Sequence, residues 1–528
     1  MAAPAEPKAT EPKATVTVTI DGKEHEFPRG QNLLEACRAV GADVPYFCYH
    51  KGLSSPAVCR QCLVEVKGAP KPVPSCYTMV ADKMEVSTSS PKILDVRRQM
   101  LEFTLLNHPI DCPICDKAGE CILQRQYFDW DAKLARNEGS KVRKAKVVDI
   151  GRHIVLDQER CILCTRCIRV CDEVAKQSEL TMAYRGARQV LTTAPGHRLD
   201  NPYSLNTVDV CPVGALTDKS FRFARRVWEL VSVPSICPGC ATGCNVEIHS
   251  ARGKIHRLVP RENLEVNKFW MCDEGRFTYR AAQQDRFLLA TVSGQRASLA
   301  TAVSKGARLL EEALARDARK VGVVFSAGAT NEDTHALARL ALDGLKIGRA
   351  YLGGAPLGWS DNILVSADKN PNTAGVERIV PPPLLTLKDL AGDVASGAVS
   401  TLLVLGNASL VLPEGRLAAV VVLSSHQGPL VETANVALPV ASWAEVEGSF
   451  TNRHGRVQRL NPALAARGDG LPAWRVAALL GHELSVDLAY TSAAEVFADA
   501  SARHPFMQSL RWGPTARPTL LRFGASRG

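Results

Sequence analysis

The chain has 528 residues, of which 46% are hydrophobic and 22% are charged. This composition is typical of a globular protein and excludes a largely disordered one, and the length predicts several domains. The formal net charge of +10 is a mild excess for this length and does not indicate a nucleic-acid partner. The longest apolar run, Thr401–Leu412, is shorter than the roughly 18 residues that a membrane-spanning helix needs, and Gly406 and Asn407 interrupt it.

The N-terminal segment predicts a tail followed by a small mixed α/β domain. Residues 1–14 are rich in Ala, Pro, Lys and Glu, which predicts a disordered tail, and they lack the features of a secretory signal or transit peptide. Thr15–Ile20 alternates Thr with Val or Ile, Asp21-Gly22 predicts a turn and Glu24–Phe27 returns, so a β-hairpin is expected. A short helix is predicted over Asn32–Val40.

The rest of the chain predicts a helix, two cysteine-rich regions and an α/β domain. Apolar residues recur at helical spacing over Ile93–His108. From about residue 290, helices alternate with short apolar strands, a pattern typical of a parallel sheet covered on both faces. The helices are expected at Ala297–Asp317 and Asn331–Leu342, and the strands at Val321–Phe325, Leu402–Leu405, Val420–Leu423 and Val436–Leu438. After the tail, the predicted domains are 15–92, 93–132, 133–225, 226–286 and 287–528.

The cysteines carry the strongest functional signal. All 17 of them lie between Cys37 and Cys272, and several are spaced three residues apart. Disulfide-bonded domains are typical of secreted chains, whereas this spacing suits ligands that share one metal centre. We therefore expect reduced thiols that bind metal.

The first set of candidate ligands is Cys48, Cys59, Cys62 and Cys76. Four thiolates, two of them on a tight loop, suit either a [2Fe–2S] cluster or a tetrahedral zinc ion. The predicted hairpin and helix around the loop favour the cluster.

The second set combines three cysteines with a histidine: His108, Cys112, Cys115 and Cys121. A lone histidine at a helix end is more often solvated, but the three cysteines lack a fourth ligand, and His108 is placed to supply it. An imidazole in place of a thiolate removes negative charge from a cluster and is expected to raise its potential. Cys-Pro-x-Cys pairs also occur in zinc knuckles.

The third set is Cys161, Cys164, Cys167 and the distant Cys211, which precedes a proline. This spacing is typical of a [4Fe–4S] cluster. Several arginines lie near it and form either a solvated basic face or a compensation for the charge of the cluster: Arg152, Arg160, Arg166 and Arg169. Cys171 extends the run to that of bacterial ferredoxins, but the cysteines for a partner cluster do not precede Cys211. Cys171 and Cys37 are therefore predicted to be free thiols.

The fourth set is Cys237, Cys240, Cys244 and Cys272. With it, fifteen cysteines and one histidine make four groups of four ligands. Four zinc sites in this order would be a coincidence, whereas a series of iron–sulfur centres has a functional reason.

The order of the four sets resembles the large iron–sulfur subunit of bacterial respiratory complex I, known as the G subunit of NADH–quinone oxidoreductase. Two segments carry the resemblance: 106–115, Leu-Asn-His-Pro-Ile-Asp-Cys-Pro-Ile-Cys, and 161–170, Cys-Ile-Leu-Cys-Thr-Arg-Cys-Ile-Arg-Val. Residues 436–458 are similar to the signature of that family's molybdopterin-oxidoreductase-like domain. The resemblance extends from about residue 15 to 460.

The resemblance implies an α+β multidomain fold. Its parts would be a β-grasp [2Fe–2S] ferredoxin-like domain, a histidine-ligated [4Fe–4S] domain, a [4Fe–4S] ferredoxin-like domain, a further [4Fe–4S] domain and a truncated α/β molybdopterin-oxidoreductase-like domain. It also implies one [2Fe–2S] and three [4Fe–4S] clusters, held by the four sets in chain order as [2Fe–2S], [4Fe–4S], [4Fe–4S] and [4Fe–4S]. No molybdopterin, flavin or NAD and no catalytic residue is expected.

The resemblance further implies a relay. Electrons would arrive from the flavin- and NADH-binding subunit, pass from the first set through the third to the second, and leave toward the quinone-side iron–sulfur subunits. The fourth set would stand off this path. The implied place is the cytoplasmic side of the bacterial inner membrane, peripheral and attached only through the complex, whose NADH:quinone oxidoreductase activity is that of the whole assembly.

Two features depart from the family: the presence of Cys171, which resembles hydrogenases and formate dehydrogenases, and the short chain, from which a trimmed last domain is expected. A molybdenum-dependent, formate dehydrogenase-like catalytic subunit shares the N-terminal layout. Against it, no cysteine follows Cys272, and Glu274 stands where such enzymes carry a lysine. A zinc-stabilised scaffold is the non-enzymatic alternative and would be colourless. No G-x-G-x-x-G follows a predicted strand, so NADH is expected to bind elsewhere.

Overall fold

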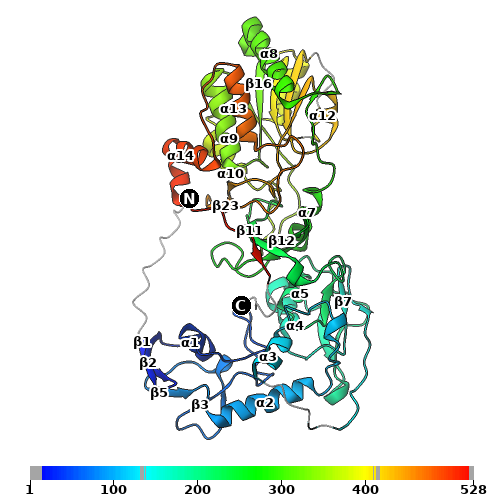
Figure 1. The fold of residues 1–528 in the computed structure, drawn as a ribbon, viewed down its shortest axis with the longest axis vertical. Coiled ribbons are helices and arrows are strands. Elements are labelled where there is room, and N and C mark those ends of the chain that lie inside the picture. The colour runs from blue at the N-terminus through cyan, green and yellow to red at the C-terminus, as the bar shows by residue number, and fades with distance from the viewer. Residues whose placement is uncertain (1–14, 131–135, 137, 408, 412–416, 522–528) are drawn as a thin grey trace, which may run out of the picture. The chain divides into compact units, whose positions relative to one another are not determined.

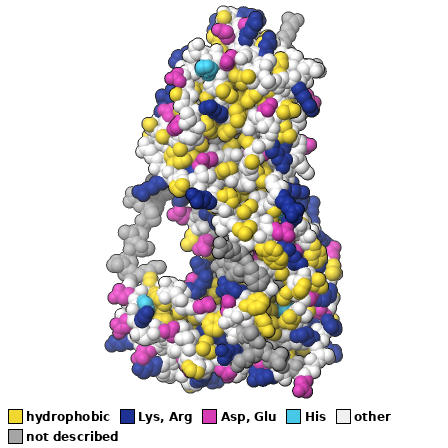
Figure 2. Space-filling model, in the orientation of Figure 1, with side chains coloured by type: hydrophobic (Ala, Val, Ile, Leu, Met, Phe, Trp, Pro, Cys, Tyr) yellow, Lys and Arg dark blue, Asp and Glu magenta, His cyan; other side chains and the backbone are white. Residues whose placement is uncertain are grey.

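The computed structural model describes residues 15–130, 136, 138–407, 409–411 and 417–521; the predicted tail, 1–14, lies outside them. The described chain forms two compact units, one up to residue 228 and the other over 229–521 (Figure 1). Among the described helices, none combines the length and the hydropathy that a bilayer-crossing segment requires. On the face drawn in Figure 2, basic and acidic side chains are interspersed over the surface.

The first unit contains three small sheets and short helices. Its strands are β1 (Thr15–Ile20), β2 (Lys23–Pro28), β3 (Leu63–Val66), β4 (Val73–Pro74), β5 (Met84–Ser87), β6 (Val148–Asp149), β7 (Ile154–Leu156), β8 (Leu180–Ala183), β9 (Val190–Thr193) and β10 (Leu216–Asp218). Its α-helices are α1 (Leu33–Ala39), α2 (Pro91–Leu105), α3 (Ile122–Trp130), α4 (Arg166–Arg169) and α5 (Asn206–Val210).

The second unit contains a large sheet with helices on both faces. Its strands are β11 (Val231–Ile236), β12 (Asn245–Ala251), β13 (Lys254–Pro260), β14 (Thr291–Val292), β15 (Gln295–Arg296), β16 (Val321–Ser326), β17 (Arg349–Gly353), β18 (Leu384–Thr386), β19 (Thr401–Leu405), β20 (Ala419–Ser424), β21 (Val436–Pro439), β22 (Gly448–Thr451), β23 (Val457–Leu460) and β24 (Thr519–Leu520). Its α-helices are α6 (Asp273–Arg276), α7 (Thr278–Ala281), α8 (Leu299–Asp317), α9 (Asn331–Ala338), α10 (Thr373–Ile379), α11 (Leu387–Ala395), α12 (Pro429–Thr433), α13 (Ala473–Glu483) and α14 (Ala493–Arg503).

Short 3-10 and π-helical turns complete the described elements. They are η1 (Ser75–Tyr77), η2 (Cys112–Ile114), η3 (Val170–Ala175), η4 (Gly186–Arg188), η5 (Val227–Glu229), η6 (Ala318–Lys320), η7 (Arg339–Gly344) and η8 (Pro505–Ser509), of which η3 and η7 are π-helical.

The predicted N-terminal hairpin and helix are confirmed. Strands β1 and β2 pair antiparallel from Thr15 opposite Pro28 to Ile20 opposite Lys23, and Asp21 and Gly22 turn the chain with positive φ angles of 48° and 83°. The sheet continues in the order β2-β1-β5-β3-β4, with β1 and β5 parallel. Asn32 caps α1 by accepting hydrogen bonds from two amides of the first turn.

Helix α2 is also confirmed, but it ends earlier than predicted. Ser90 caps its start, Pro91 occupies the first turn, and the helix stops at Leu105, so His108 lies beyond it in a turn. Pro109 explains the difference, because the residue before a proline avoids the helical conformation. The residue that was expected at the end of the helix therefore belongs to the loop that carries the second cysteine set.

The large sheet of the second unit has the order β15-β14-β21-β20-β19-β16-β17-β18, and the strands from β21 to β18 are parallel. Alternate side chains of its central strands enter two different hydrophobic cores. Val323 and Val421 pack with residues of α8, α9 and α13, whereas Val324 and Val422 pack with residues of α11 and α12. The expectation of a parallel sheet covered on both faces is confirmed.

A smaller antiparallel sheet, in the order β13-β12-β11-β24, opens the second unit and positions the fourth cysteine set. Cys237 directly follows β11, Cys244 directly precedes β12, and the amide of Cys237 donates to the carbonyl of Cys244 at 2.8 Å. The set is thus built on the connection of a β-hairpin.

Candidate metal centres

The first set gathers around the loop that precedes β3. Cys48, Cys62 and Cys76 are buried, and the amide of Cys48 lies 3.5 Å from the Sγ atom of Cys59. Thiol hydrogen bonds from Cys59 and Cys76 lower the pKa of Cys48, and one from Cys76 lowers the pKa of Cys62. All four predicted side chains of this set therefore lie within one group of sulfur contacts.

The third set gathers where β7 leads into α4, with α5 supplying the distant member. Cys167 lies electrostatically close to each of the other three thiols. Burial raises the pKa of Cys161 to about 12 and that of Cys164 to about 11. The four residues form one buried group, although Cys211 is far from the others in sequence.

The second set is brought together in part. Cys115 interacts electrostatically with Cys112 and with Cys121, and the amide of Gln124 at the start of α3 lies 3.4 Å from the Sγ atom of Cys121. His108 lines a cavity of about 160 Å³ together with Glu159 and Cys161. The contacts therefore join the three thiols, whereas the membership of His108 in this set stays a prediction.

The fourth set lines a single pocket: Cys237, Cys240, Cys244 and Cys272. The amide of Gly275 donates to the Sγ atom of Cys272 at 3.3 Å, and a Cβ atom at Gly275 would lie 3.0 Å from the Sγ atom of Cys237. Glycine is thus the residue that allows the backbone to approach two sulfurs at once. Burial raises the pKa of the Cys272 thiol to about 12.

A lysine distant in sequence also reaches the fourth set. The Nζ atom of Lys369 lies 3.1 Å from the Oε2 atom of Glu274, and both residues line the same pocket. An acidic residue stands in the sequence where molybdenum enzymes carry a lysine, and the fold supplies a cation there from another loop. Spacing in the sequence could not have found this pair, because its members are joined only by the fold.

The cysteine loops share an unusual backbone conformation. Ala57 and Arg60 in the first set, and Leu163 and Thr165 in the third, have positive φ angles of 53°, 56°, 55° and 62°, as has Ile110 beside the second set at 51°. Residues with a Cβ atom rarely adopt this conformation, and such residues concentrate at functional sites. Alternation of this kind turns successive amides toward a concavity that suits a negatively charged group.

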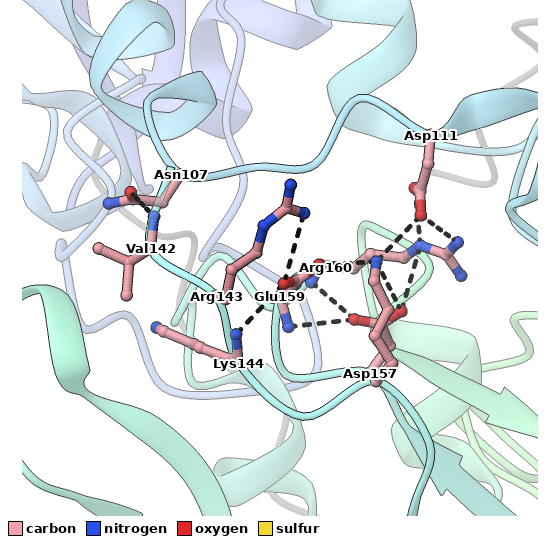
Figure 3. A network of polar contacts seen from close by, with 9 residues as sticks. Asn107, Asp111, Val142, Arg143, Lys144, Asp157, Glu159 and Arg160 are labelled. Atoms are coloured by element: carbon pink, nitrogen blue, oxygen red, sulfur yellow. Dashed lines mark hydrogen bonds and ion pairs between the residues drawn. The ribbon is translucent and has the colours of Figure 1, made fainter. Parts of the chain in front are cut away.

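The second and third sets are joined by an ion-pair network, drawn in Figure 3. Arg160, which precedes Cys161, contacts Asp111, which precedes Cys112, with Nε–Oδ1 and Nη2–Oδ2 distances of 2.9 and 2.6 Å. Asp111 stays ionised because hydrogen bonds from Arg160 and Lys146 outweigh its desolvation and lower its pKa to about 2. The sequence predicted only that Arg160 lies near the third set; its partner comes from the second.

A glycine brings the same two sets into direct contact. A Cβ atom at Gly214, three residues after Cys211, would lie 2.3 Å from the Sγ atom of Cys115. The amide of Ile122, which follows Cys121, donates to the carbonyl of Pro212, which follows Cys211, at 2.9 Å. No local pattern singles out Gly214, because its role depends on a partner about a hundred residues away.

The two predicted free thiols lie in apolar surroundings. Cys37 is fully buried within the core under the first sheet, and Cys171 is fully buried in η3. Burial raises the pKa of each thiol to about 12. Neither residue is a nucleophile at neutral pH in this environment, and their status as spare cysteines stays a prediction.

The donors fit iron–sulfur clusters in their chemistry. The sixteen proposed ligands are soft or borderline donors, as clusters require. Among the described side chains, the buried Nδ1 atom of His108 has no hydrogen-bond partner, and desolvation lowers the pKa of this ring to about 4, so it is neutral and able to donate a lone pair. Within the described ranges, no three Cys, His, Asp or Glu side chains form a group that could hold one metal ion. The fit rests on the sulfur contacts above.

Comparison with known sequence families matches the chain in the predicted order. The matched descriptions are "2Fe-2S iron-sulfur cluster binding domain" over 13–91, "NADH-ubiquinone oxidoreductase-G iron-sulfur binding region" over 97–133, "NADH-quinone oxidoreductase subunit 3, ferredoxin-like domain" over 151–217, "Molybdopterin oxidoreductase Fe4S4 domain" over 230–284 and "Molybdopterin oxidoreductase" over 294–482. These matches and the mixed α/β structure confirm the fold class at the level of domain types.

Individual relatives agree with these matches. The chain is 39% identical over 342 residues to the G subunit of the NADH-quinone oxidoreductase of Streptomyces coelicolor, an alignment that covers 63% of this chain and 41% of that protein. It is 40% identical over 277 residues to the mitochondrial NADH dehydrogenase [ubiquinone] iron-sulfur protein 1 of Solanum tuberosum, covering 52% and 37% respectively. A solved NAD+-reducing [NiFe]-hydrogenase chain is 29% identical, with a TM-score of 0.37, covering 40% of this chain and 92% of that one.

The chain spans about two fifths of the length of the curated relatives that it matches. Over that part, the resemblance expected from the cysteine spacing is confirmed: the chain is a relative of the large iron–sulfur G subunits of the NADH–quinone oxidoreductases.

Proposed function

We propose that the chain is an electron-transfer subunit of the peripheral arm of an NADH–quinone oxidoreductase. In this assignment it relays electrons from the flavin- and NADH-binding subunit toward the quinone-side iron–sulfur subunits, on the cytoplasmic side of a bacterial inner membrane. The assembly as a whole carries out the oxidoreductase reaction, and this chain contributes no catalytic acid, base or nucleophile.

The observation that carries the proposal is the position of the third cysteine set between the other two sets of the first unit. Arg169 connects the third set with the first, and the Arg160–Asp111 pair connects it with the second. A relay needs such a sequence of closely held centres, whereas a zinc-stabilised scaffold has no need for its sites to touch.

The ligand assignment follows the four sets. Cys48, Cys59, Cys62 and Cys76 hold a [2Fe–2S] cluster, and three [4Fe–4S] clusters are held by His108 with Cys112, Cys115 and Cys121, by Cys161, Cys164, Cys167 and Cys211, and by Cys237, Cys240, Cys244 and Cys272. When bound, these clusters accept and release single electrons. The corresponding domains are 15–92, 93–132, 133–225 and 226–286, followed by 287–528 without cofactor.

The protein's own contribution is to hold and shield the centres. Burial of the thiols keeps water away, and the arginines close to the sulfurs supply positive charge where the ligands bring negative charge. In this assignment, residues 287–528 support the structure of the assembly and bind no molybdenum cofactor.

The test is an elemental and spectroscopic count on the anaerobically purified chain. We expect iron and acid-labile sulfide in the amounts of one binuclear and three tetranuclear clusters, a brown colour, and neither zinc nor molybdenum in stoichiometric amounts. Zinc in place of iron would establish the scaffold alternative, and stoichiometric molybdenum would establish the formate dehydrogenase-like alternative.

A further inference from the structure

Arg169 makes a connection that goes beyond charge compensation. Its Nη2 atom donates to the carbonyl oxygen of Cys48 at 2.5 Å and to that of Cys164 at 3.4 Å. Cys48 belongs to the first set and Cys164 to the third, so one nitrogen atom spans the backbones of two different centres. The Nη1 atom of the same guanidinium donates to the carbonyl of Ser54.

Two neighbours on the same helical segment clasp the same loop. Arg166 donates to the carbonyl of Tyr49 and, at 3.1 Å, to the carbonyl of Val210, the residue before Cys211. Glu173 in η3 accepts from the amide of Ser54 at 2.8 Å and from its hydroxyl group. Three side chains from Arg166–Glu173 therefore hold the loop over residues 48–54.

The clasp is buried and specific in geometry. Arg166 is 5% and Arg169 is 8% exposed, so the hydrogen bonds to backbone carbonyls satisfy charges that would otherwise be costly to bury. The planar, forked guanidinium can reach several carbonyls at once, which the single ammonium group of lysine cannot. An arginine whose only task was to offset the charge of one cluster would not need contacts with the backbone of another.

We propose that Arg169 is a positioning residue that fixes the separation of the first and third centres and thereby sets electron exchange between them. In that exchange one electron leaves the group held by the first set, which is oxidised, and reduces the group held by the third. The inference rests on the proposed function and adds to it the residue that holds the two centres in place. Arg166 and Glu173 support the same loop.

The test compares the full chain with R169Q and R169K, each purified anaerobically with its clusters. Magnetic interaction between the two reduced centres is measured as the enhancement of spin relaxation of the binuclear signal, and the midpoint potentials of both centres are measured in the same samples. We expect R169Q to lose this enhancement and to slow electron exchange, with both potentials and the iron content kept. R169K is expected to resemble R169Q; a match of R169K to the wild type would show that charge alone matters and would overturn the inference.

Hydrogen–deuterium exchange provides a readout that needs no cluster. Amides over residues 48–54 are expected to exchange faster in R169Q, because the loop opens more often without its clasp. R188Q, which changes an exposed arginine of the same unit, is the matched control and is expected to leave every readout unchanged. Unchanged relaxation and exchange in an iron-replete R169Q would overturn the inference.

Two further outcomes have distinct meanings. If R169Q does not retain its clusters, E173Q loosens the same loop without touching a cysteine carbonyl, and a relaxation enhancement equal to that of the wild type would then refute the clasp. If the wild-type chain shows no binuclear signal and no tetranuclear signal, the proposed function itself fails. Failure of the inference with both signals present leaves the proposed function intact.

Discussion

His108 is the only donor among the sixteen proposed ligands that is not a thiol, and its chemistry gives a direct test. A thiolate at this position adds negative charge to the centre and favours its oxidised form. H108C is therefore expected to lower the midpoint potential of the second centre, measured by redox titration followed by electron paramagnetic resonance. H197A, at an exposed histidine of the same unit, should leave the potential unchanged. An identical titration for H108C and the wild type would remove His108 from the ligand set.

Glu332 is a fully buried carboxyl group at the start of α9 that plays no part in the proposed relay. Ser449 donates to both of its oxygens, with N–Oε2 and Oγ–Oε1 distances of 2.6 Å, yet desolvation dominates and raises its pKa from 4.5 to about 7. Because the folded chain binds this proton more tightly than the unfolded chain, the group contributes stability that is complete below about pH 4.5 and lost as the pH rises through about 7.

The matching substitution is E332Q, which keeps the shape of the side chain and removes its titration. The free energy of unfolding of the wild type should fall by roughly 2 to 3 kcal/mol more than that of E332Q between about pH 5 and about pH 8. Urea unfolding at the two pH values measures the difference. Equal pH dependence in the two proteins would show that Glu332 does not titrate in this range.

Single residues also show where sequence reasoning stops. The sulfur ligands could be predicted because their spacing is local and characteristic, and the structure brings the members of the first and third sets together. Arg169 could be placed near the third set by its position in the chain, but its contact with Cys48 joins residues 121 positions apart. Nothing in a local pattern selects such a partner; only the packing of the two loops does.

At the scale of elements, the turn after Cys211 must lie against the loop of the second set. A Cβ atom at Gly214 would lie 2.3 Å from the Sγ atom of Cys115 and 3.2 Å from the Cβ atom of Lys117. G214A is therefore expected to displace Cys115 and to remove the signal and the iron of the second centre, while the first centre keeps its own signal.

The matched control for G214A is G392A, at a glycine within α11 where a Cβ atom would meet nothing within 4 Å. Its higher helix propensity should stabilise the second unit by up to about 1 kcal/mol and leave all cluster signals unchanged. Full iron content in G214A would show that the loop moves aside easily and that the close approach has no role in cluster binding.

Elements with strong local signals were predicted well. The hairpin β1–β2 depends on alternation and on Asp21-Gly22, and the buried strands β16, β19, β20 and β21 depend on their unbroken apolar runs. The end of α2 was wrong by three residues, because the helical apolar pattern continues past the point where Pro109 restricts the backbone. Periodicity marks a face of a helix more reliably than it marks its end.

At the scale of the whole molecule, the fourth set belongs to a different compact unit from the other three. C237S is expected to remove one tetranuclear centre and to lower the thermal stability of the second unit, because bound metal contributes to folding. The signals of the first three centres and the flow of electrons from NADH to quinone in the assembled complex should persist. Complete loss of that flow in a normally assembled complex would place the fourth centre on the main path.

The left-handed backbone at Ala57, Arg60, Leu163 and Thr165 bears on how the protein matures. Glycine would adopt this conformation freely, whereas for residues with a Cβ atom it costs roughly 1 kcal/mol or more, and such residues offer the chain fewer other shapes. They therefore restrict the wandering of a segment that has not yet received its inorganic cargo. The newly synthesised polypeptide is thus expected to present a preformed cradle to the machinery that delivers iron and sulfide.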